Sequence, residues 1–306
     1  MSSLPIVTVL GATGYQGGSV VDALLATGKF TVRGVTRNPD SAFAKSLAQK
    51  GVQVVKGDAN DSSSLKSAFE GAWGAFLVTS FWDPSMKLDP NTDFIHGKAL
   101  VDAAVAANVK FLVWSSLHDI EKATDGKIPV PHFTMKYKVE EYIKSLNVPA
   151  AFVFAGFYAQ NWVNFPPFGV PTYDKEGQVH LDTAVQPHAK IPVIDIEEDF
   201  GKFVAPIFEH PDKFQGQDIL ASTEYLTVPE MAAAFEKITG KNVKQSTLPY
   251  SAVPLPELAN SIKLFNEKGY YLGLPLEPSL ERYSGVKFGS FENWLRRSKF
   301  DAHPAN

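Results

Sequence analysis

The sequence predicts an α/β protein with a doubly wound parallel sheet and a smaller C-terminal α+β domain. Two observations support this fold class. Short, almost continuously apolar runs alternate with segments of helical pattern over the first half of the chain, and the alternation ends after Gly156. Strands that are buried on both faces need continuous apolar runs, and alternating β and α units give parallel strands with right-handed crossovers.

Each expected strand is a short apolar run, and each expected helix comes directly after one. The run at 6–10 is rich in β-branched residues, and 15–27 has the apolar spacing of a helix. Further strands are expected at 31–36, 52–58, 74–80, 111–116 and 150–156, and further helices at 40–50, 62–69, about 92–107 and about 132–146.

The second half of the chain is less regular. Residues 165–190 are rich in Pro, Gly and polar side chains. A strand at 190–194 should lead into a helix that opens at Asp195 or Glu197. Later elements are a strand at 216–222, a helix over 227–239 with Pro near its start and Gly after its end, and a strand at 243–250.

These elements suggest two domains. A nucleotide-binding domain is expected over 1–157, with later strands from about 190–223. A smaller substrate- or partner-side domain is expected over 158–189 and 224–306.

Composition narrows the function classes. The chain has 306 residues, with 29 Lys and Arg against 33 Asp and Glu, a net charge of −4 that argues against direct nucleic-acid binding. The absence of cysteine excludes disulfides, thiolate zinc sites and a cysteine nucleophile. The seven histidines show no metal-site spacing, so no metal is expected. Without a signal peptide or a long apolar run, we expect no membrane contact and a cytoplasmic protein, or one that is also nuclear.

Three glycines lie three residues apart in the turn after the first expected strand: Gly11, Gly14 and Gly17. In such a turn the first glycine permits the sharp bend, the second lets a pyrophosphate approach the backbone, and the third lets the helix pack on the strand. The helix N-terminus adds a partial positive charge. The position therefore predicts dinucleotide binding, although turn chemistry alone would also explain the glycines.

The residues at the end of the second expected strand indicate which dinucleotide the protein binds. An acidic residue there would hold the ribose 2′-hydroxyl of NAD, but 32–38 contains none. Arg37 stands there instead, with Asn38 beside it. A guanidinium suits the 2′-phosphate of NADP(H), so we expect that cofactor; a solvated surface arginine is the alternative.

Four motifs together resemble the NmrA-like family of atypical short-chain dehydrogenase/reductases: "GATGYQGGSV", "TRNPDS", "GDANDSSSL" and "HFTMKYKVEEY". The resemblance extends from Val7 to roughly Pro249 and is loose beyond. It implies a Rossmann domain, NADP(H) binding and a smaller C-terminal domain. Members of the family include redox-sensing regulators that bind partner proteins and others credited with quinone or related reduction.

The resemblance also implies cofactor contacts at matching positions. Thr13, Tyr15 and Gln16 would join Gly11 and Gly14 around the pyrophosphate, and Ser41 would join Arg37 at the 2′-phosphate. The remaining contacts would be Asp58 and Ala59 at the adenine; Thr79, Ser80 and Phe81 after the fourth strand; and Tyr158 and Asn161 beside the nicotinamide. Asp58 could instead cap a turn.

Catalytic residues are less clear. Short-chain dehydrogenases use Tyr-x-x-x-Lys on one helix, but the only such pair here is Tyr283 with Lys287, far beyond the nucleotide-binding units. At the expected helix, "HFTMK" places His132 and Lys136 on one face.

The resemblance implies that Lys136 contacts the cofactor; an exposed surface lysine is the alternative. His132 could be a general acid or a helix-start residue satisfied by backbone groups. Ser115 and Ser116 occupy the place of the dehydrogenase serine, where packing would equally explain them.

Two functions remain open. The first is an NADP(H)-responsive regulator that acts through a protein partner such as a transcriptional regulator, which the missing tyrosine favours. The second is an NADPH-dependent reductase of a small quinone, carbonyl or imine. A group of aromatic residues favours a substrate pocket, although core packing would explain the same residues. These residues are Phe81, Trp82, Phe157, Tyr158, Trp162, Phe165 and Phe168.

Overall fold

The computed structural model describes residues 4–83, 89–165 and 168–304. The chain divides into two compact units. The first comprises Met1–Asp119, Pro131–Phe154 and Glu197–Ile219, and the second comprises Ile120–Val130, Ala155–Ile196 and Leu220–Asn306.

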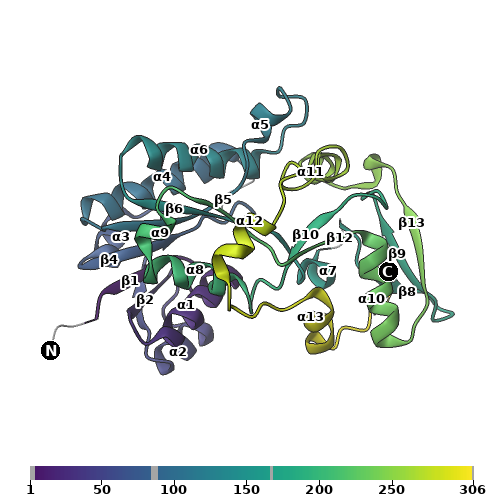
Figure 1. The fold of residues 1–306 in the computed structure, drawn as a ribbon, viewed down its shortest axis with the longest axis horizontal. Coiled ribbons are helices and arrows are strands. Elements are labelled where there is room, and N and C mark those ends of the chain that lie inside the picture. The colour runs from purple at the N-terminus through teal and green to yellow at the C-terminus, as the bar shows by residue number, and fades with distance from the viewer. Residues whose placement is uncertain (1–3, 84–88, 166–167, 305–306) are drawn as a thin grey trace. The chain divides into compact units, whose positions relative to one another are not determined.

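A seven-stranded parallel sheet is the centre of the first unit (Figure 1). Its strand order is β11-β6-β5-β4-β1-β2-β3. The strands are β1 (Ile6–Val9), β2 (Thr31–Thr36), β3 (Gln53–Lys56), β4 (Ala72–Leu77), β5 (Phe111–Ser116), β6 (Ala150–Ala155) and β11 (Asp218–Ala221). The predicted doubly wound α/β fold is confirmed. Because β1 lies between β2 and β4, the carboxyl ends of these strands border the switch point at which such sheets bind ligands.

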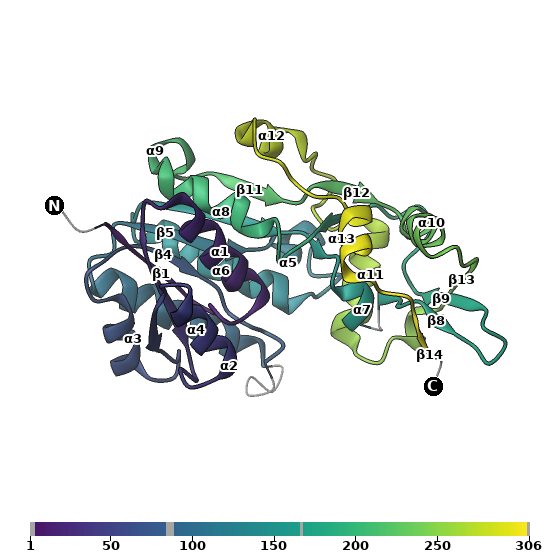
Figure 2. The same cartoon turned by 90° about the horizontal axis from the view of Figure 1, so that it is seen from below.

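Helices cover both faces of this sheet. One face carries α1 (Tyr15–Thr27), α2 (Ala42–Gln49) and α8 (Phe200–Glu209), and the other carries α3 (Ser62–Phe69), α4 (Pro90–Ala106) and α6 (Pro131–Ser145). Figure 2 shows α1 beside α8. Gly201 permits this close packing, and its amide donates a hydrogen bond to Ser19 Oγ at 2.8 Å. Short α9 (Pro211–Phe214) follows α8.

The second unit contains two small sheets. One has the order β12-β10-β7, from Glu224–Leu226, Ile191–Ile194 and Phe157–Tyr158. The other has the order β13-β9-β8-β14, from Val243–Thr247, Val179–Thr183, Thr172–Tyr173 and His303–Pro304. Its helices are α5 (Ile120–Ala123), α7 (Asn161–Asn164), α10 (Val228–Thr239), α11 (Pro256–Glu267), α12 (Glu277–Leu280) and α13 (Phe291–Ser298), with 3₁₀ turns at Tyr250–Ala252 and Glu281–Tyr283.

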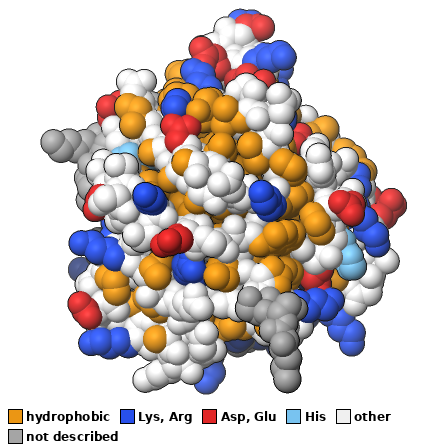
Figure 3. All heavy atoms as spheres, turned by 90° about the vertical axis from the view of Figure 1, so that its left-hand side faces the viewer, with side chains coloured by type: hydrophobic (Ala, Val, Ile, Leu, Met, Phe, Trp, Pro, Cys, Tyr) orange, Lys and Arg blue, Asp and Glu red, His pale blue; other side chains and the backbone are white. Residues whose placement is uncertain are grey.

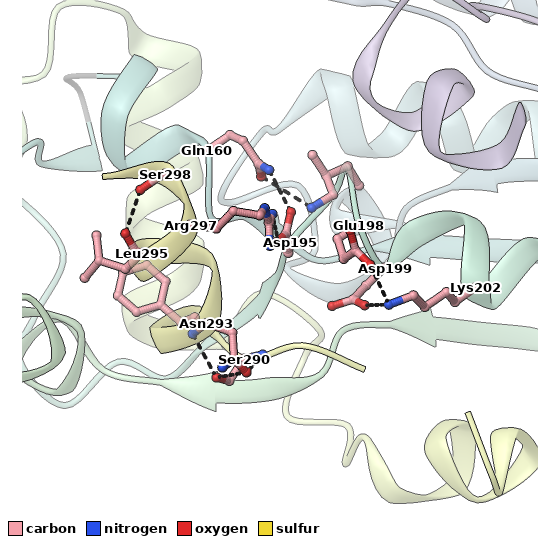
Figure 4. A network of polar contacts seen from close by, with 12 residues as sticks. Gln160, Asp195, Glu198, Asp199, Lys202, Ser290, Asn293, Leu295, Arg297 and Ser298 are labelled. Atoms are coloured by element: carbon pink, nitrogen blue, oxygen red, sulfur yellow. Dashed lines mark hydrogen bonds and ion pairs between the residues drawn. The ribbon is translucent and has the colours of Figure 1, made fainter. Parts of the chain in front are cut away.

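A buried polar network stabilises the second unit (Figure 4). Gln160 Nε2 donates to Asp195 Oδ1 at 2.9 Å, and Gln160 Oε1 accepts from the amide of Ile196. Arg297 of α13 forms an ion pair with Asp195. The network ties α13 to the segment that follows β7.

The predicted start of the helix after β10 was wrong. Asp195 and Glu197 both resemble helix-start residues, but α8 begins at Phe200 with Asp199 before it. Asp195 is buried and its carboxylate is engaged by Gln160 and Arg297, so it stabilises tertiary structure and does not cap the helix.

Candidate functional site

The glycine loop forms a tight turn between β1 and α1. Gly11 has φ of +63°, in the left-handed region, and its carbonyl accepts a hydrogen bond from the Gly14 amide at 2.8 Å. Gly14 is extended, with φ of −99°, so among the three glycines only Gly11 has a positive φ.

The other two glycines differ in what surrounds them. A Cβ on Gly17 would lie 2.2 Å from the Gly11 carbonyl oxygen, so the turn itself requires glycine there. A Cβ on Gly14 would meet only that oxygen, at 3.4 Å, which is an ordinary contact. Gly14 is exposed, and no side chain of the described residues caps the helix at this position. The N-cap of α1 is therefore a glycine that the described fold does not require, and its missing side chain leaves the first turn of the helix without a side-chain cap.

The residues predicted for the 2′-phosphate follow β2. Arg37 is exposed, and its Nη2 donates to Asp83 Oδ2 at 2.6 Å. This bond and the neighbouring charge of Asp83 hold the pKa of Arg37 above its ordinary value. The Asn38 side chain accepts from the amide of Asp40, and Ser41 Oγ caps α2 by accepting from the Ala44 amide.

The residues predicted for the adenine follow β3. Asp58 Oδ1 accepts from the amide of Asn60 at 2.9 Å and from its side chain at 3.2 Å. In the structure Asp58 therefore caps a turn, as the alternative interpretation predicted. Ala59 is half-buried in the same turn.

Lys136 lies on α6 and is buried, and its side chain reaches the carboxyl end of β4. Its Nζ donates to the Thr79 carbonyl at 2.9 Å and to Thr79 Oγ1 at 2.7 Å. The buried carboxylate of Asp93, on α4, lies 3.6 Å away. Trp114 Nε1 donates to the Lys136 carbonyl at 2.9 Å. Lys136 is thus no exposed helix lysine, whereas Lys138 on the same helix is exposed.

His132 lies one turn before Lys136, within an aromatic cluster. Its ring centroid is 5.6 Å from Phe81, 5.2 Å from Trp82 and 4.8 Å from Phe133. Phe81 is buried, and Ser80 is exposed with its carbonyl accepting from the Asp83 amide.

The two serines at the end of β5 are buried. Ser116 Oγ donates to Glu140 of α6, which also pairs with Lys144 at 2.7 Å. Burial raises the pKa of Glu140 to about 7, against the opposing effect of its bonds to Lys144 and Ser116. Ser116 is therefore engaged in a buried network that the sequence did not reveal.

The residues predicted beside the nicotinamide belong to the second unit. Tyr158 ends β7, and Asn161 begins α7; both are half-buried. Between them, the Ala159 amide donates to the Ile194 carbonyl at 2.8 Å, and Gln160 joins the network around Asp195. Their contact with a cofactor stays a prediction.

Most of the predicted aromatic wall packs as core. Phe157, Trp162 and Phe168 are buried within the second unit. Phe168 stacks on Phe265 at 5.5 Å, and Trp162 meets Phe291 edge-on at 5.1 Å. Tyr283, of the discounted Tyr-x-x-x-Lys pair, is also buried, and desolvation raises its pKa.

The predicted residues of the first unit therefore gather along one edge of the sheet. The glycine loop, Arg37, Asp58 and Thr79 follow four strands of one parallel sheet at their carboxyl ends. Sequence reasoning missed Asp83 and Asp93, which no motif distinguishes.

Over the described ranges, no group of three or more acidic or histidine side chains is arranged to hold a metal ion. Within those same ranges, no helix has the length and apolar character needed to span a membrane.

Comparisons with known proteins identify the family of the chain. The family model of the NmrA-like family matches residues 5–295, well beyond the limit at Pro249 that the motifs suggested. The NmrA-like family domain-containing oxidoreductase FrzB of a Cladobotryum species is 35% identical over 254 residues, covering 78% of this chain and 75% of the relative. The oxidoreductase cpsB of Aspergillus campestris is 33% identical over 295 residues, covering 89% of this chain and 86% of the relative.

A solved structure is similar over nearly the whole chain. The crystal structure of NmrA, a negative transcriptional regulator, matches with a TM-score of 0.81 at 25% identity, covering 96% of this chain and 95% of that one. NmrA has also been solved in complex with NADP, and that structure matches with a TM-score of 0.80 at 24% identity.

Proposed function

The chain belongs to the NmrA-like family, and from this premise we propose that it binds NADP(H) and is an oxidoreductase that reduces a small quinone, carbonyl or imine. The observation that carries the proposal is Gly14. The fold explains Gly11 by its positive φ and Gly17 by its close packing, but no contact among the residues that the structure describes requires the missing side chain of Gly14. A pyrophosphate on the amides at the start of α1 supplies that reason.

In this proposal Arg37 binds the 2′-phosphate and Lys136 binds the nicotinamide ribose. Lys136 is suited to that task because Thr79 already holds its ammonium group at the carboxyl end of β4. The cofactor would supply the hydride. The two curated relatives are both named as oxidoreductases, which favours an enzyme.

A regulator that acts through a protein partner is the second candidate. It is favoured by the similarity to the negative transcriptional regulator NmrA and by the absence of tyrosine four residues before Lys136. Figure 3 shows a face on which hydrophobic side chains gather in the middle, with charged side chains around them. Such surfaces are typical of protein contacts.

Two measurements test the proposal. Calorimetric titration with NADP⁺ and NADPH should give saturable binding, and NADPH consumption should be detected with at least one acceptor of a quinone, carbonyl and imine panel. The absence of dinucleotide binding would refute the proposal. Tight NADPH binding without turnover of any acceptor would favour the regulator.

A further inference from the structure

Arg37, the residue proposed for the 2′-phosphate, already has an anionic partner. Its guanidinium donates to Asp83 at 2.6 Å. The Asp83 side chain is 16% exposed and that of Arg37 is 61% exposed, so the carboxylate is the more fixed member of the pair. The Asp83 backbone is also held, because its amide donates to the Ser80 carbonyl at 3.1 Å.

The ion pair spans the edge of the sheet at which the dinucleotide would bind. Arg37 follows β2 and Asp83 belongs to the segment after β4, while β1 with its glycine loop lies between these two strands. Asp58 adds a second negative charge near Arg37. The positive charge that would select a 2′-phosphate is therefore partly neutralised by the protein itself.

A bound 2′-phosphate would meet Asp83 as a competitor. Both anions seek the same guanidinium, and like charges held at one cation repel each other. A ribose 2′-hydroxyl, as in NAD(H), carries no charge and does not suffer this repulsion.

We propose that Asp83 competes with the 2′-phosphate of NADP(H) for Arg37 and thereby reduces the preference of the protein for NADP(H) over NAD(H). The inference rests on the proposed function, because it needs a dinucleotide at this edge of the sheet. It assigns cofactor selectivity to two residues that lie on different loops.

The test is a calorimetric titration of NADP⁺ and NAD⁺ at low ionic strength, where exposed charges are least screened. Asp83→Asn should bind NADP⁺ about fivefold more tightly than the wild type, with NAD⁺ affinity unchanged. Asp40→Asn is the matched control, because it removes the charge of another exposed acid close to Arg37 in the sequence. Combining Asp83→Asn with Arg37→Ala should abolish the gain, since the competition acts through Arg37.

The outcomes separate this inference from the proposed function. Unchanged or weaker NADP⁺ binding by Asp83→Asn would overturn the inference while dinucleotide binding stood. An equal gain in Asp40→Asn, or a gain that persists without Arg37, would also overturn it, because the effect would then be general repulsion. A wild-type protein that bound neither dinucleotide would refute both.

Discussion

At the scale of single residues, the sequence predicted a cofactor contact for Lys136 but not the groups that hold its side chain. "HFTMK" pointed to Lys136 through its place on a helix, and the structure adds Thr79 and Asp93 as its partners. Among the described residues, neither carboxylate oxygen of Asp93 has a hydrogen-bond partner, so its ion pair with Lys136 is its main compensation for burial. A pattern within one helix cannot reveal a partner on another helix.

Replacing Lys136 by alanine should weaken NADPH binding about 10- to 100-fold, because a hydrogen bond to a charged group contributes about 1.5–3 kcal/mol. It should also lower stability by about 3–5 kcal/mol, since Asp93 is left buried and unpaired. Fluorescence titration of NADPH, with circular dichroism to confirm folding, measures both effects. Lys138→Ala, an exposed lysine of the same helix, is the control and should change neither. Normal NADPH affinity in a folded Lys136→Ala variant would exclude the cofactor contact.

Glu140 gives the protein a predictable pH dependence. Burial raises its pKa to about 7 from an ordinary 4.5. Between these values the folded state holds more protons than the unfolded state, so the contribution of Glu140 to stability is complete below about pH 4.5 and is lost as the pH rises through 7. The difference corresponds to on the order of 3 kcal/mol.

Glu140→Gln should therefore lose less stability than the wild type between pH 5 and pH 8, in urea unfolding at several pH values. Glu141→Gln is the control, because Glu141 is the exposed neighbour, with 52% of its side chain accessible. Parallel stability curves for Glu140→Gln and the wild type would show that Glu140 is ionised normally in the folded protein.

At the scale of elements, local signals located helices well where both ends were marked. Tyr15–Thr27 was predicted with its observed bounds, since Gly14 precedes the helix and Gly28 ends it in the left-handed conformation. The start of α8 was misplaced because Asp195 has the chemistry of a helix cap, while its actual partners are Gln160 and Arg297, the latter 102 residues away. A local sequence pattern cannot reveal that residues distant in the chain bind the carboxylate of Asp195.

The glycine loop offers a test that separates binding from folding. Gly14→Val should abolish detectable NADPH binding, because its side chain would occupy the space beside the N-terminus of α1, where the pyrophosphate is proposed to bind. Stability should change by only about 1 kcal/mol, since Gly14 is already extended and its Cβ would make an ordinary contact at 3.4 Å. Cofactor titration with thermal unfolding provides both readouts.

Gly17→Ala is the contrasting variant in the same turn. Its Cβ would lie 2.2 Å from a backbone oxygen, so it should lose about 3 kcal/mol or more of stability. A folded Gly14→Val variant that binds NADPH normally would mean that the loop is only a turn.

At the scale of the whole molecule, the first half of the chain was predictable and the second half much less so. Alternating apolar runs predicted six strands that join the parallel sheet, and their carboxyl ends predicted where Arg37 and Thr79 would lie. The C-terminal region contains short elements such as α12 and α13, which are held by contacts distant in sequence. The ion pair of Arg297 with Asp195 is one such contact.

At the same scale, the acceptors that the proposed reductase can use depend on whether it has a proton donor. Lys136 is proposed to bind the nicotinamide ribose, but the position that would hold the proton-donating tyrosine is His132, whose ring is packed among Phe81, Trp82 and Phe133. A positioned general acid contributes about 10²–10⁴-fold, so an unactivated ketone should be reduced very slowly or not at all. A quinone should be reduced more readily, because its reduced oxygens are weakly basic and can take protons from water.

His132→Ala should therefore barely change any quinone rate, while NADPH binding persists in the variant and the wild type alike. The measurement is NADPH consumption with matched ketones and quinones, followed for both proteins across neutral pH. Fast ketone reduction that collapses in His132→Ala would contradict the prediction, and His132 would then be a general acid that replaces the tyrosine. The expected preference for quinones over ketones follows from a single difference in "HFTMK", where His132 stands at the position of the dehydrogenase tyrosine.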